Sequence, residues 1–261
     1  MPLVQLASLD ALSGHAVSDS TIAILPVAAT EAHGPHLPAT TDCDIAEGHL
    51  RALPGYLATN IDAVVLPVER IGASLEHTRF AATESRDAAD LVQAWFAIAS
   101  AVREAGIRRL VIVSSHGGNS AAVDIVTLRA RAELGLLAVA TAWMRFGYPD
   151  GLFDETERRY GIHGGDIETS LMLHYTPGQV DMRHAETFVS RLTDWEAGMT
   201  HLSGYGKHRF GWLSSDFNDH GVVGNAAAAT ADKGAALADH ILKGFAELLE
   251  DVAAFDLRRL Q

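Results

Sequence analysis

Short apolar runs alternate with segments of helical periodicity along the first part of the chain, and this alternation limits the folds available to it. The runs are rich in Val, Ile and Leu and suit single buried strands; they cover residues 21–27, 62–68, 108–115 and 135–144. Helices are expected over residues 44–53, 86–106 and 119–134. Apolar strands joined by helices are typical of parallel sheets covered on both faces. The pattern therefore predicts an α/β fold, a three-layer α/β/α sandwich with a mainly parallel central sheet.

The length of the chain, 261 residues, suits one large α/β domain or two small ones. Hydrophobic residues make up 48% and charged residues 20%, which indicates neither disorder nor a fibrous architecture. No linker, internal repeat or low-complexity tract divides the sequence. We therefore expect a single domain over residues 1–261.

Acidic residues outnumber basic ones 33 to 20, which gives a formal net charge of −13. A charge of this sign repels nucleic acid and anionic membrane surfaces, and no cluster of Lys and Arg offsets it. Cys43 is the only cysteine, so no intrachain disulfide can form. The sequence lacks a secretory signal and a long apolar stretch. We expect a cytoplasmic protein with no nucleic-acid partner and no membrane partner.

Candidate metal ligands follow the first apolar run directly: Glu31, His33, His36 and Asp42. Glu31 and His33 are two positions apart, which in extended backbone directs both side chains to the same side. Asp42 on its own is better explained as a helix cap. As a set, however, mixed oxygen and nitrogen donors in one short segment favour a hydrolytic metal site.

A second candidate element follows the third apolar run, where His116 precedes two glycines and Asn119. This element and the loop after the first run both come at the carboxyl end of a predicted strand, so we expect them to meet at one edge of the sheet. The glycines and the following helix would also suit an anion, so phosphate binding is the alternative here. The turn lacks the Lys-Ser/Thr pair of a phosphate-binding loop.

A third candidate element contains His163, Asp166 and Glu168, just before an apolar segment that suggests a short helix. Asp166, Thr169 or Ser170 could simply be capping residues. Glu168 is harder to explain in this way, because a glutamate beside apolar residues needs a partner when it is buried. The element therefore adds a histidine and a carboxylate to the candidate set.

In order and spacing, these elements resemble the motifs of the creatininase family, the creatinine amidohydrolases and their relatives. The matching stretches are LPVAATEAHGPHLPATTD, SHGGN and HGGDIETSLML, with a fainter match in SLEHTRFAAT. The agreement extends over roughly residues 1–245, which is nearly the whole chain. Separate motifs in the right order are a specific signal.

The resemblance implies a fold that holds two divalent metal ions, zinc or alternatively manganese or iron. In the family's pattern Asp42 would bridge the ions, and the terminal ligands would be Glu31, His33 and His116. One position departs from the pattern, because creatininase itself has a glutamate where this chain has Gly118. We assign the missing carboxylate ligand to Glu168.

The resemblance also implies roles in catalysis and substrate binding. His163 would protonate the leaving nitrogen, and Glu168 belongs to the catalytic set as well as to the ligands. The predicted substrate-binding residues are His36, His77, Trp143 and Asn119. His36 is as easily explained by local hydrogen bonds, and Trp143 by packing in the core. Glu76 lies beside His77, in a loop that the family places near the pocket.

The predicted function is a metal-dependent amidohydrolase that hydrolyses a cyclic amide, a formamide or the amide bond of a short peptide with a metal-activated water. Its partner would be a small-molecule amide, cleaved at a C–N bond other than the ordinary peptide bonds of proteins. Creatinine is less favoured, because Arg159 and Tyr160 precede His163 where creatininase has a tryptophan. Arg159 would suit a ligand with a carboxylate or phosphate.

Two alternatives stay open at this point. One is a non-catalytic anion- or nucleotide-binding α/β module, in which the carboxylates are helix caps. The other is a degenerate family member that assembles without hydrolysing anything. The family also implies a homo-oligomer, such as a hexamer. The segment 195–224, rich in glycine and aromatic residues, would form a lid or a subunit contact.

Overall fold

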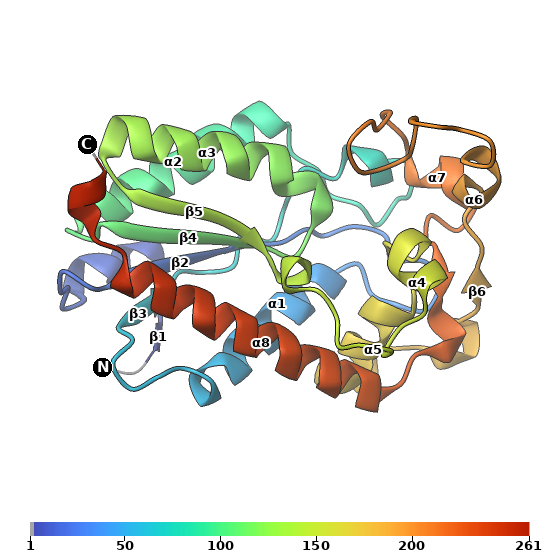
Figure 1. The fold of residues 1–261 in the computed structure, drawn as a ribbon, viewed down its shortest axis with the longest axis horizontal. Coiled ribbons are helices and arrows are strands. Elements are labelled where there is room, and N and C mark those ends of the chain that lie inside the picture. The colour runs from blue at the N-terminus through green and yellow to red at the C-terminus, as the bar shows by residue number, and fades with distance from the viewer. Residues whose placement is uncertain (1–2, 261) are drawn as a thin grey trace.

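A five-stranded sheet forms the centre of the molecule, which a computed structural model describes over residues 3–260 (Figure 1). Its strands are β1 (Val4–Gln5), β2 (Ile22–Val27), β3 (Ala63–Val65), β4 (Arg109–Ser114) and β5 (Leu137–Ala142). Their order is β1-β3-β2-β4-β5, and each neighbouring pair is parallel. The predicted parallel sheet is confirmed, and the fold adds β1, which the apolar pattern did not predict.

Helices cover both faces of the sheet and complete the predicted three-layer arrangement (Figure 1). One layer contains α1 (Thr41–Ala52), α5 (Asp166–Tyr175) and α8 (Ala231–Ala254). The opposite layer contains α2 (Ala88–Glu104) and α3 (Ser120–Leu134). The helices expected from periodicity are therefore present, and α1 begins early enough to include Asp42 in its first turn.

Two hydrophobic cores, one on each face of the sheet, explain why the central parts of the strands are apolar. Every residue of β2 and of β4 is buried. Ile24 faces the core that contains Phe245 of α8, whereas the next residue, Leu25, faces the core that contains Trp95 of α2. Because alternate residues of a strand point to opposite faces, a sheet covered on both sides favours nearly continuous apolar runs in its strands.

Helix α8 lies along the sheet with one apolar side. Leu237, Ile241, Phe245 and Leu249 recur every four residues, and all are buried. The helix begins after Thr230, whose hydroxyl oxygen accepts a hydrogen bond from a backbone N–H in the first turn. Within residues 3–260, no helix is both long and apolar enough to cross a lipid bilayer.

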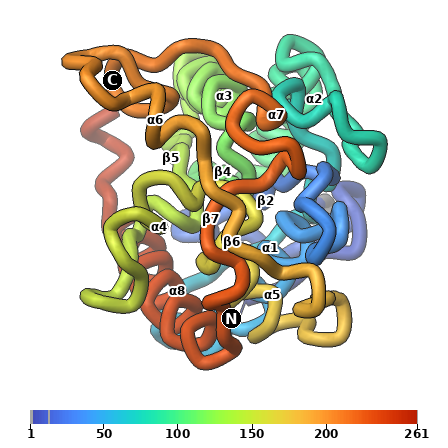
Figure 2. The backbone as a smooth tube through the Cα atoms, turned by 90° about the vertical axis from the view of Figure 1, so that its right-hand side faces the viewer, coloured from blue at the N-terminus to red at the C-terminus, as the bar shows by residue number. Residues whose placement is uncertain are grey.

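The chain between β5 and α8 folds over the carboxyl ends of the strands, at the right of Figure 1 and towards the viewer in Figure 2. It contains α4 (Glu155–Tyr160), α6 (Leu192–Trp195) and α7 (Ser214–Phe217). It also contains an antiparallel pair of short strands, β6 (Thr187–Phe188) and β7 (Gly224–Asn225). The loops after β2, β3 and β4 end at this same edge, so the added segment encloses them.

Candidate metal centre

Acidic and histidine side chains from separate segments gather at the carboxyl edge of the sheet. They come from the loop after β2, the first turn of α1, the 3-10 turn after β3, the loop after β4, and the start of α5 with the segment before it. In chain order they are Glu31, His33, Asp42, His77, His116, His163 and Glu168. All are buried except Glu168, whose side chain keeps 16% exposure.

His116 lies between two carboxylates. Its Nδ1 atom is 3.1 Å from Glu31 Oε1 and 3.5 Å from Asp42 Oδ2. The ligand atoms of these three residues lie within 4.8 Å of one another, which is the spacing of a group that could hold one metal ion. The loop bearing Glu31 is fixed by a 2.9 Å hydrogen bond from its backbone N–H to the carbonyl of Ala39.

His33 lies between Asp42 and a different carboxylate. Its Nε2 atom is 3.7 Å from Asp42 Oδ1 and 3.6 Å from Glu168 Oε2. The backbone N–H of Gly164 donates a 2.6 Å hydrogen bond to Glu168 Oε2, which fixes this carboxylate. Asp42 therefore directs one oxygen towards His33 and the other towards His116. A carboxylate in this position is arranged to bridge two ions.

His163 and His77 lie beside Glu31. His163 Nδ1 and His77 Nε2 are each 3.6 Å from Glu31 Oε1. The ring of His163 lies 4.1 Å from the rings of both His33 and His77, measured between centroids. Glu31, His33 and His163 form a further group with ligand spacing. The geometry thus allows His163 to act either as a ligand or as a proton donor beside the ligands.

The outer nitrogens of the ligand histidines are held by backbone carbonyls. These hydrogen bonds, of 2.9 to 3.0 Å, join His33 Nδ1 to Glu31, His163 Nε2 to Ala32 and His116 Nε2 to Ala73. A carbonyl oxygen only accepts, so each outer nitrogen carries a hydrogen. The inner nitrogen faces the carboxylates and, when it carries no proton, can bind a metal ion, which is the usual arrangement of metal-binding histidines.

Several polar atoms at the middle of the cluster are buried and have no hydrogen-bond partner among the residues that the structure describes. They are both carboxylate oxygens of Glu31, Oδ2 of Asp42 and Nε2 of His33. Each such atom costs about 1–3 kcal/mol when it is left without a partner. Neutral imidazole and carboxylate donors together suit zinc, manganese or iron. The residues present therefore fit divalent metal ions.

The charges of the cluster partly balance one another. Burial favours the neutral form of Glu31, but His116 and the other nearby histidines hold the pKa of Glu31 well below its usual value. Burial and the charge of Glu31 raise the pKa of Asp42. Burial opposes protonation of His116, yet the carboxylates of Glu31, Asp42 and Glu76 raise its pKa to about 10. A metal ion can replace the proton of His116 as the positive charge beside these carboxylates. Metal binding is therefore expected to release protons.

The chain is similar to known proteins over most of its length. A family model described as creatinine amidohydrolase matches residues 11–249. This chain belongs to the creatininase family. The mycofactocin precursor peptide peptidase of Mycobacterium tuberculosis is 31% identical over 196 residues, which cover 72% of this chain and 68% of that protein.

Solved structures place the fold in the creatininase family as well. A Bacteroides fragilis protein named as a candidate creatinine amidohydrolase has a TM-score of 0.76 and 25% identity, with 97% of each chain covered. A creatininase variant described as the Zn-Zn type has a TM-score of 0.67 and 22% identity, with 89% of this chain and 90% of that chain covered. The similarity to this creatininase variant concerns the fold alone.

Of the residues predicted to bind substrate in this creatininase-family chain, His77 lies in the cluster and His36 is directed away from it. His36 Nε2 is 3.0 Å from the carbonyl oxygen of Gly164 and 3.0 Å from Thr169 Oγ1. Its ring stacks on Phe188 at 5.4 Å. Burial lowers the pKa of His36 to about 4. These contacts tie the loop after β2 to the start of α5, which favours a supporting role.

Asn119 and Trp143, the other predicted substrate-binding residues, are also engaged within the fold. Asn119 Oδ1 accepts a 2.9 Å hydrogen bond from the backbone N–H of Ala73, and its Nδ2 donates a 3.0 Å bond to the carbonyl of Ala28. These bonds connect the loops after β2, β3 and β4. Trp143 packs on Phe245 in the core, with ring centroids 4.7 Å apart. Both sets of contacts favour structural roles over contact with substrate.

Part of the segment 195–224 lies against the loops of the centre. Ser214 Oγ in α7 donates a 3.1 Å hydrogen bond to the carbonyl of Glu76, and the backbone N–H of Val223 donates a 2.8 Å bond to the carbonyl of His163. These contacts join the segment to the loops that carry His77 and His163, and whether it is a lid or a subunit contact stays a prediction.

Glu76 is a residue of the site that the predicted set of site residues did not include. It belongs to the 3-10 turn η3 (Leu75–His77), and its Oε1 is 3.5 Å from His116 Nε2. The available signal was its position beside His77 in a loop that faces the pocket in the family. Nothing in the local sequence indicates which ring atom it would approach.

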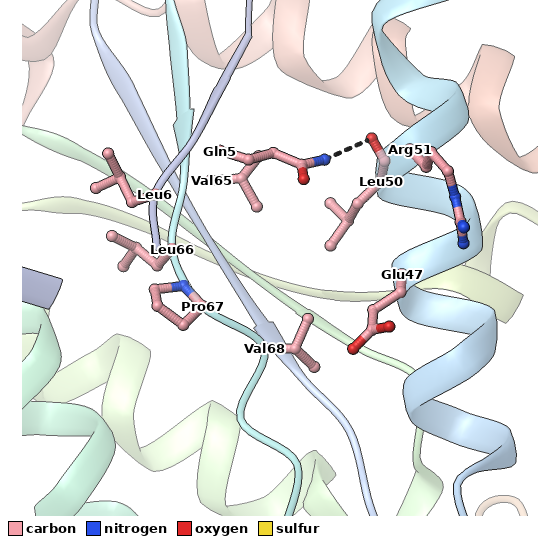
Figure 3. Close-up of a pocket in the computed structure, with 9 residues that line it drawn as sticks. All are labelled: Gln5, Leu6, Glu47, Leu50, Arg51, Val65, Leu66, Pro67 and Val68. Carbon is pink, nitrogen blue, oxygen red and sulfur yellow. Dashed lines mark hydrogen bonds between the residues drawn. The ribbon is translucent and has the colours of Figure 1, made fainter. Parts of the chain in front are cut away.

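A surface pocket of about 360 Å³ lies between β1, β3 and α1 (Figure 3). Its lining includes Gln5, Glu47, Leu50, Arg51 and Val68. The side chain of Gln5 donates a 3.2 Å hydrogen bond to the carbonyl of Leu50 across this space. The lining contains none of the clustered ligands, so this pocket is separate from the candidate metal centre.

Proposed function

We propose that this protein is a metal-dependent amidohydrolase that hydrolyses an amide bond in a short peptide. Membership of the creatininase family supports hydrolysis of a C–N bond. Similarity to a mycofactocin precursor peptide peptidase favours a peptide over the cyclic amides and formamides that the sequence left open. The reaction would add water across the amide and release a carboxylic acid and an amine.

The proposal is carried by the position of Asp42 between two histidines. Its oxygens lie 3.7 Å from His33 Nε2 and 3.5 Å from His116 Nδ1, and Glu168 and Glu31 complete the two groups. Two divalent ions bound there, zinc or alternatively manganese or iron, would polarise the substrate carbonyl and lower the pKa of a water molecule.

The protein's own groups would orient the reactants and move a proton. Glu168 would orient the water, because its side chain is 16% exposed and can reach solvent, whereas the side chains of Glu31 and Asp42 are buried. His163 would hold a proton on Nδ1 and give it to the leaving nitrogen, since its Nε2 is fixed by a backbone carbonyl. His77, next to His163, would line the space for the substrate.

Arg159 has no part in this proposal. Its guanidinium donates a 2.6 Å hydrogen bond to Glu196 Oε2, and the hydroxyl of Tyr160 donates a 3.3 Å bond to the same oxygen. The guanidinium of Arg159, which the sequence suggested for binding a substrate carboxylate or phosphate, is therefore already paired with Glu196.

Metal analysis combined with a substrate screen tests the proposal. We expect about two divalent ions per chain and release of a new amine from short peptides, in a set that also includes lactams, formamides and creatinine. Bound metal without turnover would indicate a degenerate family member. The absence of both metal and turnover would favour the non-catalytic anion- or nucleotide-binding module. Robust turnover of creatinine would contradict the peptide preference.

A homo-oligomer, such as a hexamer, is a further part of the proposal. On α3, the apolar side chains of Ile125 and Leu128 are 50% and 71% exposed. The neighbouring strand β5 lies at the edge of the sheet, and most of its residues are partly exposed. Apolar side chains next to a sheet edge favour contact with another chain. Native mass spectrometry would count the chains, and a monomer at every concentration would contradict this part.

A further inference from the structure

A carboxylate outside the predicted ligand set lies behind His116. Glu76 Oε1 is 3.5 Å from His116 Nε2, the ring nitrogen opposite to the one that faces Glu31 and Asp42. The same Nε2 donates a 3.0 Å hydrogen bond to the carbonyl of Ala73. The imidazole is therefore held by acceptors on its outer side and faces the ligand carboxylates on its inner side.

The turn after β4 is shaped around this carboxylate. A Cβ atom at Gly118 would lie 2.7 Å from Glu76 Oε1, 2.4 Å from His116 Nε2 and 2.2 Å from the carbonyl oxygen of Ala73. Contacts this short do not occur in folded proteins, so a side chain at this position would displace the neighbouring loop. Gly118 thus allows Glu76 to approach the ring of His116.

Glu76 is also fixed from the side of α7. Its backbone carbonyl accepts the hydrogen bond from Ser214 Oγ in α7. Its side chain is 19% exposed, whereas Glu47 on the surface of α1 is 44% exposed.

We propose that Glu76 is a positioning residue, which orients the imidazole of His116 towards a metal ion and strengthens the binding of that ion by its charge. The inference rests on the proposed metal-dependent function. A carboxylate beside the outer N–H of a ligand histidine fixes the ring and makes the inner nitrogen more basic. Glu76 acts through His116 because it faces Nε2, and Nδ1 is the atom that faces Glu31 and Asp42.

The substitution Glu76→Gln tests this role, because it keeps the size of the side chain and removes its charge. Affinity for Mn²⁺ and for Zn²⁺ would be measured by competition with a chromophoric chelator. We expect the affinity to fall by about 10-fold or more. The matched control is Glu104→Gln, at the end of α2 on the opposite edge of the sheet, and its affinity should equal that of the unsubstituted protein.

Two further readouts separate positioning from a merely structural role. Thermal unfolding in excess chelator should show that Glu76→Gln still unfolds in one cooperative transition, so that a loss of metal affinity is not the result of an unfolded protein. The visible spectrum of Co²⁺-loaded protein, which reports ligand geometry, should change in Glu76→Gln and not in the control. Should Glu76→Gln not fold, Glu76→Ala provides the same measurements.

The outcomes distinguish this inference from the function on which it rests. If the unsubstituted protein binds metal and Glu76→Gln binds it equally well with the same spectrum, the positioning role is overturned and the proposed function stands. If the unsubstituted protein binds neither Mn²⁺ nor Zn²⁺, the proposed function itself is overturned.

Discussion

The carboxylate of Asp42, in the first turn of α1, lies 3.5 Å from Nδ1 of His116, in the loop after β4. Both side chains are buried, so their interaction is little weakened by water. The other oxygen of Asp42 faces His33. This one residue therefore links the two groups of candidate ligands, and the proposed metal centre would depend on it more than on any single histidine.

Replacing Asp42 by Ala is expected to disrupt both groups at once. Bound metal should fall from about two ions per chain to less than one, and peptide hydrolysis should fall to background. Elemental analysis and amine release measure the two effects. The matched control is Asp44→Asn in the same helical turn, which can still accept the hydrogen bond from Thr40 Oγ1. Full metal content in Asp42→Ala would contradict the bridging role.

Metal binding should stabilise the folded protein, because the ligand geometry exists only when the loops are assembled. At an ion concentration about 100 times the dissociation constant, the stabilisation is about 2.7 kcal/mol. For a chain of this size this corresponds to a rise in Tm of about 5–10 °C. Differential scanning calorimetry with added Zn²⁺ or with chelator measures the shift. An equal rise in Tm for Asp42→Ala would show that the ions bind at another site.

Replacing His163 by Gln should affect turnover more than metal binding. Loss of the proton donor is expected to lower kcat by about 10²–10⁴. The kcat for an anilide, which has a good leaving group, should fall less than the kcat for an ordinary peptide, because its leaving nitrogen depends less on protonation. Exposed His184 provides the control substitution, His184→Gln. A fall in bound metal would instead make His163 a ligand, in line with its 3.6 Å distance from Glu31.

His49 should give the stability of the fold a pH dependence. It is fully buried, and its Nδ1 atom shares a 2.8 Å hydrogen bond with the hydroxyl of Tyr175. Burial, with a smaller effect of His174, lowers the pKa of His49 to about 3. The unfolded residue titrates near about 6.5, so its contribution to stability is complete above that pH and is lost as the pH falls from about 6.5 towards about 3.

Urea unfolding at pH 7 and at pH 4.5 measures this effect. Between these values the unsubstituted protein should lose about 3 kcal/mol of unfolding free energy through His49. In the variant His49→Gln the side chain cannot titrate. This variant should therefore lose less unfolding free energy between the two pH values, although it starts from a lower stability at pH 7. Equal losses in the two proteins would exclude His49 as the cause.

The motifs identified the family, but the supporting residues were not separated from the reactive ones by sequence. His36 and Asn119 stand inside the same motifs as His33 and His116, yet their side chains bind to the backbone of neighbouring loops. Chemistry alone could not distinguish them, since a histidine or an amide suits either role. Glu76 was underrated for a different reason, because it lies in the faintest of the matching stretches and gains its position from an irregular turn.

The sequence by itself determined the parallel sheet, the helices on both faces and the concentration of ligands after the strands. These features follow from the alternation of apolar residues and from local chemistry, which neighbouring residues encode. Only the tertiary structure decided which nitrogen faces which carboxylate: Asp42 between His33 and His116, and Glu76 behind His116. Such distances depend on strand order and on how α5 and α7 pack over the sheet edge, and these are set by contacts between residues far apart in the chain.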